Sequence, residues 1–162
     1  MNDTLTGTAI ELLEEVRAHL PASTPARAHV AAYTLTAPLT SSADWWDELA
    51  SIEAEVTRHI RATRPRTIVI VVESLDPEAE PHEVVSLTRS LVSEATRFAL
   101  TSIGSHLTAI GVAVLDIDTR TRIASRIATH ISGATAFGDG VVLTDRDLRR
   151  RSIRQLIGEE LL

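Results

Sequence analysis

The sequence contains no cysteine and no lysine, and each absence excludes a group of chemistries. Without cysteine the chain forms no disulfide, binds no metal through thiolates and offers no thiol nucleophile. All 16 basic residues are arginine. Mechanisms that require a lysine amine, such as Schiff-base formation or phosphate binding by a P-loop, are therefore excluded.

Long hydrophobic runs are also missing. No stretch reaches the roughly 18 apolar residues of a membrane span, and the opening segment MNDTLTGTAIELLEEV has no basic part followed by an apolar part. We therefore expect a cytoplasmic chain with no membrane partner. The formal net charge of -6 disfavours nucleic acid as a partner. With 162 residues, 44% of them hydrophobic, the chain is long enough for one domain with its own core.

Helix-like and strand-like patterns alternate along the chain. Apolar spacing predicts helices over 8–20, 43–63, 83–107, 119–131 and 147–160, and strands over 28–35, 67–74, 111–117 and 140–145. This alternation indicates an α/β fold that is Rossmann-like, with a mostly parallel sheet of about four strands and flanking helices. If the strands are sequential and the crossovers right-handed, these helices lie on one face. The last helix or a second protein chain must then cover the other face.

Several segments follow one another in an order known from one enzyme family. A strand over 28–35 is followed by Trp46-Asp47 near a helix start, by TIVIVVES ending in Ser74, and by SHLTAIGVAVLDI and ISGATAFGDGVVLTD. On these segments, residues 8–145 resemble a short-chain dehydrogenase/reductase (SDR). The family's Gly-x-x-x-Gly-x-Gly fingerprint is absent. The resemblance thus implies a half-sized relative that lacks the N-terminal cofactor-binding half and binds no NAD(P) by itself.

The resemblance carries over only one residue of the family's catalytic set. Ser74 stands at the position of the catalytic serine, whereas Glu53 stands where a helix carries the catalytic asparagine. The Tyr-x-x-x-Lys pair falls on Arg89 and Ser93, and the only tyrosine, Tyr33, belongs to a different element. A tyrosine acting as general acid needs a nearby cation to lower its pKa. We therefore expect no oxidoreductase activity from this chain alone.

The resemblance also implies how the chain associates. In the family, the helices matched by 43–63 and 83–107 form a four-helix bundle with a second subunit, and the second helix here carries two apolar lines. We expect a non-catalytic subunit that forms a homodimer, or a heteromer with a full-length ketoreductase or dehydrogenase that it stabilises or regulates. The predicted interface residues are Trp45, Leu49, Ile52, Glu53, Val56, Val84, Leu87, Leu91 and Phe98.

The alternative is a cofactor-independent enzyme. It would act as a lyase, cyclase or isomerase on an acyl or polyketide-like substrate, using Ser74, Tyr33 and Asp116 or His82 at the ends of the strands. Such an enzyme needs a pocket with convergent polar groups and perturbed pKa values.

Three further patterns favour structural interpretations. One acidic loop could offer oxygen ligands to a divalent cation, but it is more typical of a solvated loop; its residues are Glu73, Asp76, Glu78, Glu80, His82 and Glu83. The six histidines show no metal-ligand spacing, so we predict no metal site. The run at 149–151 is more typical of a solvated helical turn than of a contact for an acidic partner.

Overall fold

The computed structural model describes residues 4–22, 27–35, 42–133 and 139–160. The parts of the resemblance at 36–41 and 134–138 lie outside these ranges. The elements, in chain order, are β1 (Leu5–Thr6), α1 (Ile10–His19), β2 (Ala28–Leu35), α2 (Ser42–Thr63), β3 (Thr67–Ser74), α3 (Pro81–Phe98), the π-helical turn η1 (Ala99–Ile103), β4 (Thr108–Val114), the 3-10 turn η2 (Ile117–Thr119), α4 (Arg120–Ser132), β5 (Val142–Thr144), the 3-10 turn η3 (Asp147–Arg149) and α5 (Ile153–Glu160).

All five strands are parallel, and they are neighbours in chain order from β1 to β5. The predicted Rossmann-like α/β fold is therefore confirmed, with one strand more than the expected four. The additional strand, β1, pairs with β2 through Leu5–Val30 and Thr6–Ala31. The prediction for β4 was shifted, because Gly104 in the left-handed region (φ 73°) ends the preceding helix early and the strand begins at Thr108.

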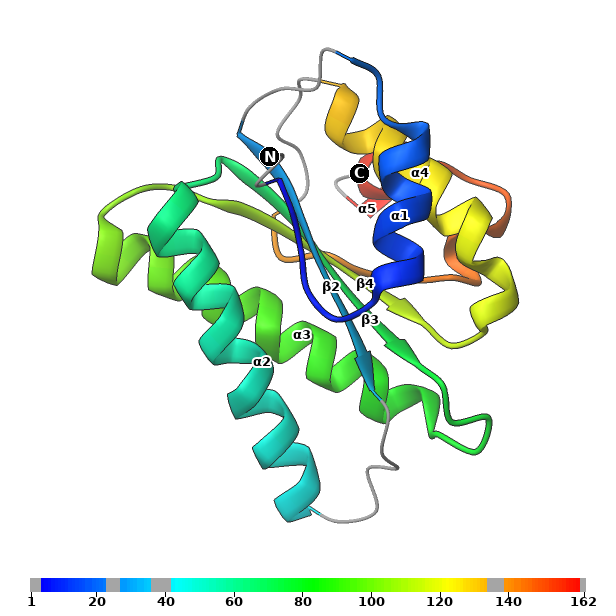
Figure 1. Cartoon of the computed structure of the whole chain (residues 1–162), viewed down its shortest axis with the longest axis horizontal. Helices are drawn as coiled ribbons and strands as arrows, with labels where there is room; N and C mark the ends of the chain where they lie inside the picture. Colours follow the sequence, from blue (N-terminus) through cyan, green and yellow to red (C-terminus); the bar gives the residue numbers. More distant parts are fainter. Residues whose placement is uncertain (1–3, 23–26, 36–41, 134–138, 161–162) are drawn as a thin grey trace.

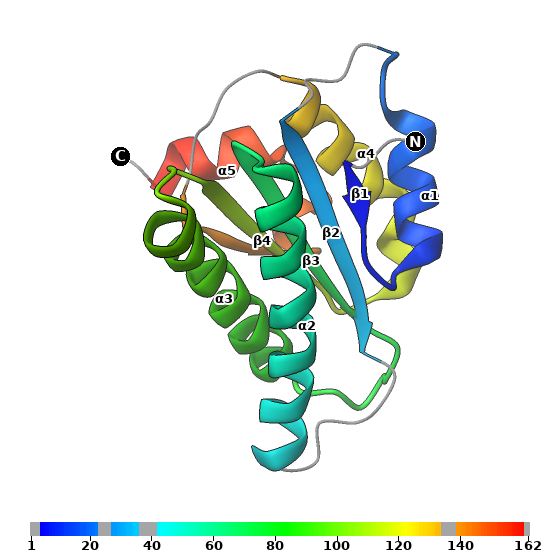
Figure 2. The ribbon, with the colours of Figure 1, turned by 60° about the vertical axis from the view of Figure 1, so that its left-hand side comes forward.

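Helices cover both faces of the sheet (Figures 1 and 2). α1, α4 and α5 pack on the face that carries Val69 and Val71, whereas α2 and α3 pack on the face that carries Ile68 and Ile70. The strands are sequential, but the condition of right-handed crossovers, under which all these helices would lie on one face, is not met. Because consecutive strands are neighbours throughout, crossovers on opposite faces have opposite hands. Two of the four crossovers are therefore left-handed, which is the rare hand.

The change of face between α1 and α2 has a precedent in doubly wound sheets. In the strand order 3-2-1-4-5-6, strand 1 lies next to strand 4, and the crossovers change face at this point. The run 1-4-5-6 has the same neighbours as β1 to β4 of this chain. The change of face at β2 is therefore the one expected of a doubly wound sheet without its second and third strands, whereas the return of α4 to the α1 face is a second change that this comparison does not account for.

The turn between β1 and α1 requires glycine. Gly7 has φ +122°, and a Cβ atom there would lie 1.9 Å from the carbonyl oxygen of Ala32. This close approach lets the amide of Ala9 donate to the Ala32 carbonyl at 3.0 Å, and the amide of Thr34 donate to the Thr8 hydroxyl at 3.0 Å. The start of α1 is thereby held against the carboxyl end of β2.

Candidate functional site at the carboxyl edge of the sheet

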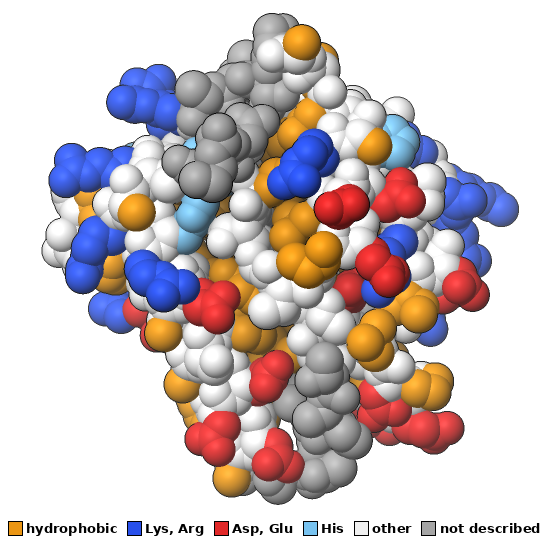
Figure 3. Space-filling view, in the orientation of Figure 1, with side chains coloured by type: hydrophobic (Ala, Val, Ile, Leu, Met, Phe, Trp, Pro, Cys, Tyr) orange, Lys and Arg blue, Asp and Glu red, His pale blue; other side chains and the backbone are white. Residues whose placement is uncertain are grey.

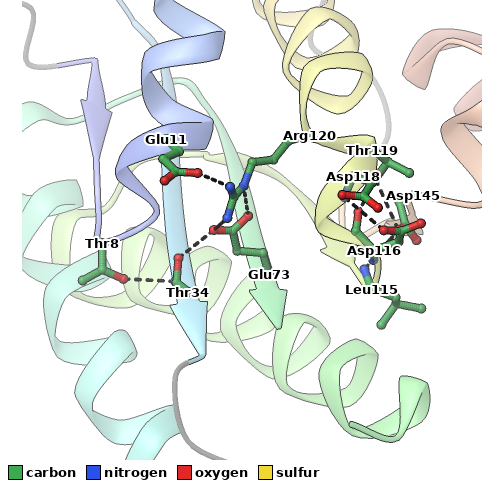
Figure 4. A network of polar contacts seen from close by, with 10 residues as sticks. All are labelled: Thr8, Glu11, Thr34, Glu73, Leu115, Asp116, Asp118, Thr119, Arg120 and Asp145. Atoms are coloured by element: carbon green, nitrogen blue, oxygen red, sulfur yellow. Dashed lines mark hydrogen bonds and ion pairs between the residues drawn. The ribbon is translucent and has the colours of Figure 1, made fainter. Parts of the chain in front are cut away.

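A buried ion pair occupies the edge of the sheet where the strands end. Glu73, near the end of β3, is only 1% exposed. Arg120, at the start of α4, donates to its carboxylate from Nε at 2.9 Å and from Nη2 at 3.0 Å. The hydroxyl of Thr34, the register partner of Glu73 on β2, donates at 2.7 Å (Figure 4). A carboxylate buried this deeply is costly unless it is fully paired, and these three hydrogen bonds pair it.

The ion pair extends to the surface through α1. Arg120 also contacts the carboxylate of Glu11, whose side chain is 78% exposed. The hydrogen bonds that Arg120 donates to Glu73 raise the pKa of Arg120 above its ordinary value, so its guanidinium stays charged. The network thus joins β2, β3, α1 and α4 (Figure 4), and its outer member, Glu11, is exposed to solvent.

A second buried carboxylate fixes the adjoining loop. Asp145, directly after β5, accepts hydrogen bonds from the amides of Leu115 at 3.1 Å and Asp116 at 2.8 Å. The carboxylate of Asp116 in turn accepts one from the amide of Asp118 at 3.0 Å. These bonds hold the loop from which α4 and Arg120 begin.

Large apolar side chains are exposed around this polar network. Ile10 comes after β1, Trp46 after β2, Leu75 after β3 and Ile117 after β4, and each is between 38% and 62% exposed. Because the strands are parallel, the segments that follow them emerge at the same edge of the sheet. Figure 3 shows hydrophobic side chains among acidic ones at this end of the molecule. Among the described residues, Leu100 is the other large apolar side chain with comparable exposure, and it lies in η1.

The two predicted catalytic residues lie on the same face of the sheet without forming a shared site. Ser74 accepts a hydrogen bond from the amide of Asp76 at 3.3 Å, which is a turn-stabilising contact. Tyr33 is 2% exposed, and its hydroxyl has no hydrogen-bond partner in the described chain. Burial raises the pKa of Tyr33 far above its ordinary value, so this hydroxyl stays protonated.

The remaining candidates for polar chemistry are also dispersed. Asp116 lies at the carboxyl edge, whereas His82 is exposed at the start of α3, with its ring 3.9 Å from Glu80. Glu73, which by sequence was counted with the acidic loop, pairs with Arg120. In the part of the chain that the structure describes, no group of three His, Asp or Glu side chains is placed to hold a metal ion.

Most of the predicted interface residues lie inside the chain itself. Six of the nine are buried in the core that α2 and α3 form with the sheet: Leu49, Ile52, Val56, Val84, Leu87 and Leu91. The two apolar lines on α3 have an internal cause, because the helix packs against the sheet on one side and against α2 on the other. These six residues therefore cannot contact a partner while the chain is folded.

The other three predicted interface residues are partly exposed. Burial, together with the nearby carboxylate of Glu94, raises the pKa of Glu53. Arg61 lies over the ring of Phe98, 5.3 Å from its centre. Trp45 packs edge-on against Trp46, with ring centres 4.8 Å apart. The outer seam between α2 and α3 is thus largely charged, and the aromatic contact belongs to the start of α2.

Sequence reasoning did not single out the ion pair. Glu73 had a signal, since it is the one charged residue in the apolar run TIVIVVES. Arg120 had none, because it stands 47 positions away among other arginines. Comparison with known proteins finds no matching family model, no matching curated protein and no matching solved structure. None of the described helices has the length and apolar character needed to cross a membrane.

Proposed function

We propose that this chain is a non-catalytic α/β subunit that works by associating with a second protein chain through its carboxyl edge. The observation that carries this proposal is the exposure of Ile10, Trp46, Leu75 and Ile117 around one edge of the sheet. Large apolar side chains exposed at one edge of an otherwise well-buried chain favour a protein contact surface there. Trp46 suits a contact surface, because a large rigid ring anchors well in a partner's pocket.

The strand order supports the view that this domain is a reduced one. In a doubly wound sheet, ligands bind at the carboxyl ends of the strands, where the crossovers change face. One of the two changes of face in this chain lies between α1 and α2, and in the described chain the Thr34 amide bonds to the Thr8 hydroxyl there. Among the described residues, no strand pairs with β1 on the side away from β2. Such an edge is better suited to contact with a second chain than to enclosure of a cofactor.

The nature of the partner rests on the resemblance to the SDR family. If the resemblance holds, the partner is a full-length reductase, and this chain stabilises or regulates it. The contact proposed here differs from the two-helix interface expected from the sequence, because the apolar stripes of α2 and α3 are used inside the chain. Of the two helices α2 and α3, only the first turn of α2, with Trp45 and Trp46, belongs to the surface proposed here.

Native mass spectrometry of the chain purified gently from its host tests this proposal. We expect a complex of fixed stoichiometry, and we expect the double variant Trp46→Ser/Ile117→Ser to be recovered alone. The matched control is Leu100→Ser, which removes an equally exposed apolar side chain from η1. Circular dichroism must show that all variants are folded. Loss of the complex in the control, or its retention in the folded double variant, would contradict the proposal.

A second candidate function is cofactor-independent catalysis, and one observation favours it. Within the described chain, the hydroxyl of Tyr33 is buried without a hydrogen-bond partner, on the sheet face that also carries Ser74. A buried hydroxyl without a hydrogen bond is unfavourable unless a ligand satisfies it. A substrate that reached Tyr33 would have to displace part of the core, and its binding would therefore change the fluorescence of this single tyrosine.

A further inference from the structure

Arginine is concentrated in the segment that follows β5. Residues 146–154 (RDLRRRSIR) contain five of the 16 basic residues of the chain and one acidic residue. The net charge of the whole chain is -6, so this segment reverses the sign of the charge locally. Four of its side chains, Arg146, Arg149, Arg150 and Arg151, line an open groove of about 450 Å³ between η3 and α5.

Among the described residues, the acidic side chains at the groove, including Asp147 in its lining, form no ion pair with Arg146, Arg149 or Arg150. Asp147 accepts hydrogen bonds from the amide and hydroxyl of Thr144 at 2.8 and 2.9 Å. The carboxylate of Asp145 is buried and accepts backbone amides. Arg151 pairs with Glu159. Among the described residues, Arg146, Arg149 and Arg150 form no ion pair, so three guanidinium groups remain to bind an anion.

The backbone beneath these arginines is firmly anchored. Leu148 in η3 and Ile153 and Ile157 in α5 are at most 1% exposed, and all three belong to the core on the α1 and α4 face. Arg149 and Arg150 follow directly after Leu148, so their Cα positions are set by core packing. A fixed backbone reduces the entropy lost when the side chains close on a ligand.

We propose that this groove binds a compact anion with two or more negative charges, of the diphosphate or phosphate-ester class. Guanidinium groups donate in pairs to phosphate oxygens, and several of them together match a multiply charged group. The volume lies within the range of small-molecule sites, and the half-buried side chain of Leu156 supplies an apolar wall.

The charge of the remaining surface limits the size of the ligand. At physiological ionic strength, charges act over roughly 8 Å. A compact anion in the groove therefore experiences mainly the arginines. A long polyanion would also meet the acidic surface of a chain whose net charge is -6. This difference favours a small phosphorylated molecule over nucleic acid, and the inference does not depend on the proposed association.

Calorimetric titration of the full chain with inorganic pyrophosphate, at about 0.15 M ionic strength, tests this site. We expect saturable binding with one equivalent, and an affinity at least about tenfold weaker in Arg149→Gln/Arg150→Gln, because two charged hydrogen-bond donors are lost. The control Arg17→Gln/Arg89→Gln changes the net charge equally at two exposed sites elsewhere. Its affinity should match that of the unmodified chain.

Two further titrations test other classes of negatively charged ligand. A glutamate-rich peptide or a short single-stranded oligonucleotide that binds more tightly than pyrophosphate would overturn the proposal of a compact ligand. Equal weakening in both double variants would also overturn it, because it would show a non-specific effect of net charge. Absence of saturable pyrophosphate binding would have the same meaning.

Discussion

Arg120 and Glu73 are separated by 47 positions in the chain and form a bidentate ion pair, with N···O distances of 2.9 and 3.0 Å. The pair links the start of α4 to the end of β3. Thr34 on β2 donates to the same carboxylate. The contact therefore fixes one helix layer to the central strands at the edge where the proposed partner binds.

Removal of one member of this pair should be strongly destabilising. Arg120→Met leaves the Glu73 carboxylate buried with only the Thr34 hydroxyl, and we expect a loss of about 3–5 kcal/mol in the free energy of unfolding. Urea unfolding monitored by circular dichroism measures this loss. Glu11→Gln is the matched control, since it removes an exposed pair to the same arginine and should cost less than about 1 kcal/mol.

Replacing both members should recover most of that loss. In Arg120→Met/Glu73→Leu no buried charge remains, and well-packed apolar groups often match or exceed a buried ion pair. We expect the double variant to be more stable than Arg120→Met alone. A double variant that is as unstable as the single one would show that the pair contributes to folding beyond charge neutralisation.

Two glycines should respond in opposite ways to alanine. Gly7→Ala places a Cβ atom against the carbonyl oxygen of Ala32 in a left-handed backbone, and we expect a loss of at least about 2 kcal/mol. Gly158 lies in α5 with no atom near its Cβ position, so Gly158→Ala should stabilise the chain by roughly 0.5–1 kcal/mol. Thermal unfolding should therefore give a lower midpoint temperature for Gly7→Ala and a higher one for Gly158→Ala.

Tyr33→Phe should leave stability unchanged or increase it. The substitution removes a buried hydroxyl that has no hydrogen-bond partner in the described chain, and an unsatisfied group of this kind costs about 1–3 kcal/mol. A clear loss of stability would show that the hydroxyl has a partner. Because Tyr33 is the only tyrosine, its ionisation can be followed by absorbance.

Because the pKa of Tyr33 is raised, the free energy of unfolding should decrease at alkaline pH. The native state favours the neutral phenol, so its contribution to stability is complete below the ordinary tyrosine pKa of about 10 and is lost above it. We expect phenolate to appear only as the chain unfolds. Phenolate formed in the folded chain near pH 10 would contradict the burial of this side chain.

Acidification should destabilise the chain through His130. Burial lowers the pKa of His130 in the native state, so the unfolded chain binds more protons. The free energy of unfolding should therefore fall as the pH drops below about 6.5, the ordinary histidine pKa. His130→Gln should reduce this dependence, and His106→Gln, at an exposed position, serves as the control. Equal slopes in all three proteins would contradict the prediction.

The sequence predicted the strands well where an apolar run was continuous. β2 and β3 begin and end at the expected residues, because turn-forming and basic residues bound their runs. β1 was missed, since two paired residues leave no periodic signal. The predicted helix was extended past Gly104 to Leu107, although the polar residues Ser105 and His106 interrupt the apolar pattern there.

The faces of the sheet could not be predicted from periodicity. An apolar stripe shows that a helix packs against something, and it does not distinguish the chain's own sheet from a partner. Leu87 and Leu91 illustrate this, as their spacing suits a subunit interface and a core equally well. The pairing of Glu73 with Arg120 was equally inaccessible, because it depends on which face α4 occupies.

Photo-cross-linking from the carboxyl edge tests the proposed association most directly. A photoreactive amino acid replaces Trp46 in one variant and Leu100 in another, and both chains are irradiated in the native host. We predict a single cross-linked product of defined mass from position 46 and none from position 100. Products from position 100 alone, or from both positions equally, would contradict association through the carboxyl edge.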